Sequence, residues 1–141
     1  MATVQGHALW ASVKTPNTRF EPKWEVTLVV DDEVADDFKS RGHNIKQTDD
    51  GPAIVIRRKV EKKDGSHRMA PTLKDKEGKE VDTKVGNGSL VKVQYNEYDW
   101  NYNGRNGKGL DFKALQIIDL VEYNPDGAEL DALNEKEVEG I

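Results

Sequence analysis

The chain has 141 residues, of which 35% are hydrophobic and 33% are charged, and its formal net charge is −5. This length and composition predict one small domain with a lean core and exclude a large multi-layer enzyme. No cysteine is present, which excludes disulfides and thiolate zinc sites and fits a reducing cytoplasm. The N-terminus lacks the apolar run of a signal peptide, and no apolar stretch is long enough to span a membrane. We therefore expect a soluble, intracellular protein.

The charge is unevenly distributed along the chain. Residues 124–141 contain six acids and one base, which gives this segment a net charge of −5. Residues 57–113 contain 14 bases and nine acids, a net charge of +5, whereas residues 1–56 carry a net charge of −3. The sequence therefore predicts a basic surface on the domain and an acidic tail behind it.

Two strands are predicted near the N-terminus. Residues 4–14 read as the first strand, and Thr15-Pro16-Asn17-Thr18 ends it because proline cannot donate to a strand ladder. Residues 23–30 are rich in strong β-formers and predict the second strand. Alternation predicts that one face of the first strand carries Leu9, Ala11 and Val13, and that one face of the second carries Trp24, Val26, Leu28 and Val30.

A short helix and a third strand follow. The acidic run Asp31-Asp32-Glu33 is typical of a helix N-terminus, and Gly42 suits its end. Residues 53–60 predict a strand whose inward alternation is interrupted by Arg58. In residues 67–84 we expect no element beyond an extended piece around Met69 and Leu73.

The last part of the domain is predicted to be a hairpin. Residues 90–96 alternate as a strand, residues 98–109 read as an aromatic, glycine-rich loop, and residues 110–123 form the returning strand. The alternation changes face within that returning strand, which indicates a β-bulge or burial on both faces. Five short strands and one short helix predict a mainly β fold, a small five-stranded Greek-key barrel of the OB type. We expect this domain to span residues 1–123, with residues 124–141 as a flexible acidic tail.

The predicted loop suggests a nucleic-acid surface. Tyr98, Trp100 and Tyr102 stand there among glycines, amides and the cations Arg105 and Lys108. Exposed rings beside cations are what a single-strand binding surface needs. Loop aromatics also cap hydrophobic cores, so core capping is the alternative for each ring. The bases between residues 57 and 68 have two interpretations as well, phosphate contact and protection of a strand edge against aggregation.

Other chemistries fit poorly. The run from Gly104 to Gly109 lacks the Gly-Lys-Ser/Thr ending and following helix of a phosphate-binding loop. His7, His43 and His67 are scattered without metal-ligand spacing, and no recurrent catalytic arrangement appears. Asp111 is expected to be a solvated strand residue. We therefore predict no enzyme activity, no metal and no cofactor.

Several segments in the same order resemble one family. They are Leu9-Trp10-Ala11 with Thr15-Pro16-Asn17, the strand from Lys23 to Leu28, the turn Val85-Gly86-Asn87-Gly88-Ser89, and the final strand from Leu115 to Tyr123. Over about residues 4–123 the chain resembles the tailed-phage single-stranded DNA-binding proteins, which have an OB fold. The resemblance implies binding of single-stranded DNA in phage replication and recombination, in the cytoplasm of a bacterial host. It also implies an acidic tail that contacts replication proteins. Related tails commonly end in an aromatic residue, whereas this chain ends in Ile141.

On this reading the DNA would contact two groups of residues. The phosphates would follow the cations Arg57, Lys59, Lys92, Arg105, Lys108 and Lys113. The bases would stack on Trp100, Tyr102 and Tyr98, with Trp10 and Phe112 as further candidates. No membrane and no small-molecule substrate is expected. The alternatives are a protein-interaction module and a single-stranded RNA binder. RNA binding stays open because a stacking surface does not read the 2′-hydroxyl.

Overall fold

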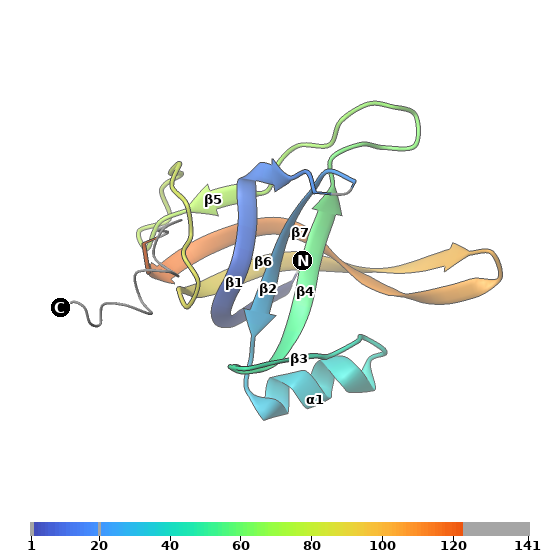
Figure 1. Cartoon of the computed structure of the whole chain (residues 1–141), viewed down its shortest axis with the longest axis horizontal. Coiled ribbons are helices and arrows are strands. Elements are labelled where there is room, and N and C mark those ends of the chain that lie inside the picture. The colour runs from blue at the N-terminus through green and yellow to red at the C-terminus, as the bar shows by residue number, and fades with distance from the viewer. Residues whose placement is uncertain (1, 20, 123–141) are drawn as a thin grey trace.

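The computed structural model describes residues 2–19 and 21–122. Within them, seven strands form one sheet in the order β3-β4-β2-β1-β6-β7-β5 (Figure 1). The predicted tail, residues 124–141, lies outside the described residues. The elements are β1 (Ala2–Asn17), β2 (Lys23–Val29), α1 (Asp32–Ser40), β3 (Lys46–Thr48), β4 (Gly51–Lys59), β5 (Thr72–Lys74), β6 (Leu90–Tyr102) and β7 (Arg105–Asp119).

The sheet closes into a barrel of five strands. β1, β2, β4, β6 and β7 are joined by antiparallel pairs, except that β4 and β7 close the ring in parallel at Arg57 and Asp111. This confirms the predicted OB-type barrel with one short helix. The sequence missed β3, and β5 corresponds to the extended piece expected around Leu73.

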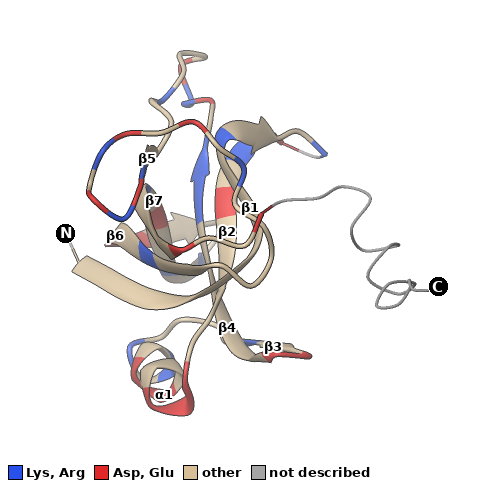
Figure 2. Cartoon of the chain, turned by 90° about the vertical axis from the view of Figure 1, so that its left-hand side faces the viewer, with Lys and Arg blue, Asp and Glu red and all other residues tan. Residues whose placement is uncertain are grey.

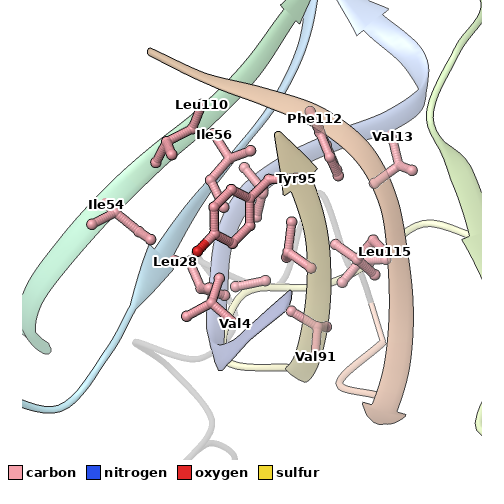
Figure 3. Packing of buried hydrophobic residues seen from close by; sticks show 14 of the residues in the cluster. Val4, Val13, Leu28, Ile54, Ile56, Val91, Tyr95, Leu110, Phe112 and Leu115 are labelled. Carbon is pink, nitrogen blue, oxygen red and sulfur yellow. The ribbon is translucent and has the colours of Figure 1, made fainter. Parts of the chain in front are cut away.

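Alternating apolar side chains fill the barrel. Phe112, Leu28, Ile56 and Leu115 are fully buried, and Tyr95 joins them at 3% exposure (Figure 3). The predicted inward face of the second strand is confirmed. Its side chains Trp24, Val26, Leu28 and Val30 are all buried in the core cluster.

The face predicted for β1 was wrong because the strand contains a bulge. Its pairing with β2 shifts between Leu9 and Ser12, and the intervening Trp10 has a φ of 51°. Before the bulge Ala8 points into the core, and after it Val13 does. The extra residue reverses the alternation, so Trp10 lies outside the barrel.

The helix begins and ends where its sequence signals lie. The Asp31 carboxylate accepts a hydrogen bond from the Val34 backbone N–H at 2.9 Å, and Gly42 follows the helix with a φ of +96°. Ala35 and Phe38 are buried, and the Phe38 ring lies 5.8 Å from that of Tyr95. The helix therefore packs on the lower end of the barrel in Figure 1. No helix in the described part of the chain is long and apolar enough to span a membrane.

The segment predicted as a loop is a β-ribbon. β6 continues to Tyr102 and β7 starts at Arg105, so both strands leave the barrel together as a two-stranded arm (Figure 1). Asn103 and Gly104 form its turn with φ values of 51° and 77°. Two successive positive φ values are typical of a type I′ hairpin turn, whose twist matches that of the flanking strands.

Two further expectations concern β7. Gln94 pairs with Ala114 while Tyr95 pairs with Phe112, so Lys113 is the extra residue of a bulge, as the broken alternation predicted. Asp111 is not a simple solvated residue. It accepts hydrogen bonds from Nε and Nη2 of Arg58 at 2.9 and 2.8 Å. This hydrogen bonding raises the pKa of Arg58. Arg58, which interrupts the inward alternation predicted for its strand, is therefore a cation paired with Asp111.

Candidate nucleic-acid interface

The arm formed by residues 97–109 carries its aromatic rings on one face. Tyr98, Trp100 and Tyr102 alternate along β6, and their cross-strand partners are Gly109, Gly107 and Arg105. A Cβ atom on Gly107 would lie 2.5 Å from Cζ2 of Trp100, and one on Gly109 would lie 2.3 Å from Cζ of Tyr98. The two rings therefore rest directly on glycine backbone. They stay 43% and 46% exposed, and Tyr102 is 72% exposed.

A groove of about 360 Å³ lies between the arm, β4 and the segment 43–46. Among the described residues, its lining contains three cations, Lys46, Arg57 and Lys108, and no carboxylate. Two of the arm's rings also line it, Tyr98 and Trp100. The groove thus offers stacking surface and positive charge together, which is the combination that a single strand needs. We call this groove the arm groove.

The acids at the base of the arm are paired. Glu97 forms an ion pair with Arg41 and lies 3.2 Å from Nε2 of His43, and Asp99 pairs with Nζ of Lys108 at 2.9 Å. Burial and the neighbouring cations Arg41 and Lys108 lower the pKa of His43. At neutral pH His43 is therefore uncharged, and the charge of the arm groove comes from its lysines and Arg57.

A second, larger hollow has the opposite charge. It has a volume of about 980 Å³, lies between α1 and the start of β1, and is lined by Asp31, Glu33 and Asp37. Figure 2 shows acidic residues along α1 and basic residues on β4. A phosphate backbone would be repelled at the helix, so the arm groove is the better candidate.

Trp10 lies on the outer surface of β1 and is 57% exposed. Nζ of Lys46 lies 5.1 Å from the centre of its ring. The backbone N–H of Trp10 donates to Oδ1 of Asn87 at 2.8 Å. The turn Gly86-Asn87-Gly88-Ser89, read from the sequence as a turn only, therefore also holds the bulge that carries Trp10.

Solved structures share this architecture. The protein gp2.5, a single-stranded DNA-binding protein encoded by bacteriophage T7, matches with a TM-score of 0.65 at 15% identity over 89% of this chain and 94% of that chain. The single-stranded DNA-binding protein from bacteriophage Enc34 matches with a TM-score of 0.62 at 12% identity, over 89% and 85%. The Enc34 protein in complex with single-stranded DNA gives a TM-score of 0.61 at 12% identity, over 86% and 88%.

The chain has the fold of phage single-stranded DNA-binding proteins. The resemblance found in the sequence is thereby confirmed for the fold. No protein-family model and no curated protein sequence matches the chain significantly. At identities of 12–15% the solved structures establish the architecture, and the candidate binding surface is argued from this chain's own residues.

Apart from Phe112, the predicted site residues fall into three groups. Arg57, Lys108, Tyr98 and Trp100 meet in the arm groove. Tyr102 and Arg105 continue the same face toward the tip of the arm. The residues outside the groove are Lys59, two positions beyond Arg57 on β4 and 3.5 Å from the Glu21 carboxylate, Trp10 on β1, Lys113 at the bulge of β7, and Lys92 on β6.

Two members of the predicted set, Phe112 and Lys92, fit the candidate site least. Phe112 was wrong as a stacking residue because its ring is fully buried inside the barrel. Lys92 is exposed, but its cross-strand neighbours are Gln5 and Gln116, and none of the three lines the arm groove. Lys46 was missed. The sequence offers little to mark it as a site residue, because it is a single lysine before the turn at Asp49-Asp50-Gly51.

In the described part of the chain, no group of three or more His, Asp or Glu residues is placed to hold a metal ion.

Proposed function

We propose that this protein binds single-stranded DNA with little sequence preference, in phage replication and recombination in the cytoplasm of a bacterial host. Bases stack on Trp100, Tyr98 and Tyr102, and phosphates contact the cations of the arm groove. The observation that carries the proposal is the pair of rings laid on Gly107 and Gly109 beside three cations. Stacking is tolerant of sequence because every base has a π-face. The fold shared with the phage proteins supports the same function.

Two other predicted cations extend this surface. Arg105 lies on the aromatic face of the arm, and Lys59 lies on the same face of β4 as Arg57. We propose that both contact phosphates of the strand where it extends beyond the groove. Lys113 and Lys92 are left out of the proposed surface, because β5, rather than β4, is the neighbour of β7 beyond Lys113, and Lys92 does not line the arm groove.

A fluorescence titration tests the proposal. Of the three tryptophans, Trp24 is buried and Trp10 and Trp100 are exposed, so stacking should quench a large part of the emission. Oligo-dT and oligo-U should be titrated in parallel into the full chain. Quenching by DNA supports the proposal, stronger quenching by RNA indicates an RNA binder, and no response to either indicates a protein-interaction module.

We further propose a role for the acidic tail, which lies outside the described residues. Its net charge of −5 opposes the basic surface of residues 57–113, so it can compete with DNA and contact replication or recombination proteins once released. Deleting residues 124–141 should tighten DNA binding most at low salt, since screening weakens the competition at high salt. Equal affinities of the full and truncated chains at low salt would contradict this role.

A further inference from the structure

Trp10 is held outside the barrel by several hydrogen bonds. Its φ of 51° is uncommon for a bulky residue, and such a conformation persists only where the surroundings impose it. The surroundings here are the turn 86–89. Ala8 donates to the Ser89 carbonyl, Gly88 donates to the Ala8 carbonyl, and Trp10 donates to Asn87 Oδ1, each at 2.8 Å. The backbone that carries the exposed indole is thus held in place by the fold.

Lys46 connects this ring to the arm groove. Its ammonium lies 5.1 Å from the centre of the Trp10 ring, and the same side chain lines the groove that contains Trp100. The strand register agrees with this connection. Leu9, the neighbour of Trp10, pairs with Thr27, which pairs with Val55 in the groove lining. A row of cross-strand neighbours on β1, β2 and β4 therefore leads from the residue beside Trp10 to the lining of the arm groove.

The charges around Trp10 indicate on which side of its ring the phosphates of a bound strand would lie. Asp49 and Asp50 share a hollow with Trp10 on the side of the β3–β4 turn. The lysine lies on the side of the arm groove. A phosphate backbone that reached Trp10 would be repelled by the two carboxylates and attracted by Lys46.

We propose that Trp10 and Lys46 form a second nucleotide subsite, separate from the arm and used by longer single strands. The inference rests on the proposed function. In the free protein the ammonium of Lys46 covers the indole face. A base then replaces it, because base stacking outweighs an exposed cation–π contact, and the released lysine contacts the adjoining phosphate.

The first test is binding of oligo-dT of increasing length, measured by anisotropy. Trp10→Gly is the suitable variant because glycine adopts the positive φ of this position without strain. We expect it to leave short oligonucleotides unaffected and to weaken long ones by about 5- to 150-fold, the range of one lost stacking contact. Trp100→Ala should weaken all lengths. Wild-type affinity of Trp10→Gly at every length, with Trp100→Ala still impaired, would overturn the subsite and leave the proposed function intact.

The second test keeps the ring and follows its emission. In Trp100→Phe the remaining tryptophans are Trp10 and the buried Trp24, so quenching reports on Trp10. Long oligonucleotides should quench this variant and short ones should not. Bound long oligonucleotide without quenching would overturn the proposal. Lys46→Gln should reduce the salt dependence more for long strands than for short ones, because only long strands reach Trp10, and Lys92→Gln, an exposed lysine outside the groove, is its matched control.

Discussion

The β6–β7 hairpin has two halves that use aromatic and apolar residues differently. In the half within the barrel, Val93 and Tyr95 face Leu115 and Phe112, and all four side chains are buried. In the arm, Tyr98 and Trp100 face glycines and stay more than 40% exposed. The position along the hairpin therefore decides whether a ring is enclosed. Within the barrel the Tyr95 ring is packed among core side chains, whereas in the arm the rings of Tyr98 and Trp100 lie on glycine backbone and keep part of their surface exposed.

The largest expected effect is in the barrel half. Phe112→Ala should lower the free energy of unfolding by about 3–5 kcal/mol, because it leaves a large cavity among fully buried side chains. Urea denaturation followed by circular dichroism measures this. The folded fraction should bind oligo-dT normally. Normal stability with lost DNA binding would instead make Phe112 a stacking residue.

In the arm half, Trp100→Ala should weaken oligo-dT binding by roughly 1–3 kcal/mol through the loss of one stacking surface. Its thermal stability should change little, because the ring is 43% exposed on a ribbon outside the barrel. Anisotropy and a thermal melt of the same sample separate the two quantities. Lost folding cooperativity would show that Trp100 belongs to the core.

The role of glycine in the comparison can be tested without removing a ring. Gly107→Val places a Cβ about where the Trp100 ring now lies, 2.5 Å from its Cζ2, so the ring must move. We expect weaker DNA binding than wild type, with a smaller loss than for Trp100→Ala, and unchanged stability since valine suits a strand. Asn106→Val, on the opposite face of the arm, is the matched control. Equal binding by both variants would contradict the importance of the ring's position.

The smallest expected effect concerns one charge in the groove. Arg57→Ala should make the dependence of log affinity on log salt shallower by about 0.7, the value for one phosphate contact on a single strand. Lys59→Ala should act in the same direction. Lys92→Ala should leave the slope unchanged. An equal change for Arg57 and Lys92 would mean that the arm groove is not the path of the backbone.

The sequence was sufficient for the barrel because local signals and alternation agreed there. Trp24, Val26 and Leu28 share a face in a run of β-formers, and Asp31 and Gly42 mark the ends of the helix. The sequence did not predict the inward face of β1 around Trp10. One inserted residue reverses the alternation there, and nothing in the local composition marks it. The arm was missed although Asn103-Gly104 is a strong hairpin signal, since the surrounding glycines and amides read as loop.

The candidate site could be predicted in part. The rings of the arm and Arg57 were identified by residue type and by the local excess of bases. The exclusion of Phe112 and the inclusion of Lys46 depend on which face of a strand meets which neighbour, and on contacts between segments far apart in the chain. Arg58 and Asp111, 53 residues apart, are the clearest example, because neither shows its partner in the local sequence.

That ion pair has a consequence for the folding kinetics. β4 and β7 join the barrel through one parallel bridge beside the Arg58–Asp111 pair, whereas each of the other barrel strands pairs with its neighbours in antiparallel fashion over several residues. Closing a long loop for so few contacts is entropically costly, so we expect this seam to form after the rate-limiting step of folding. Asp111→Asn should then accelerate unfolding in stopped-flow experiments and leave the refolding rate nearly unchanged. A slower refolding rate would place the seam in the folding nucleus.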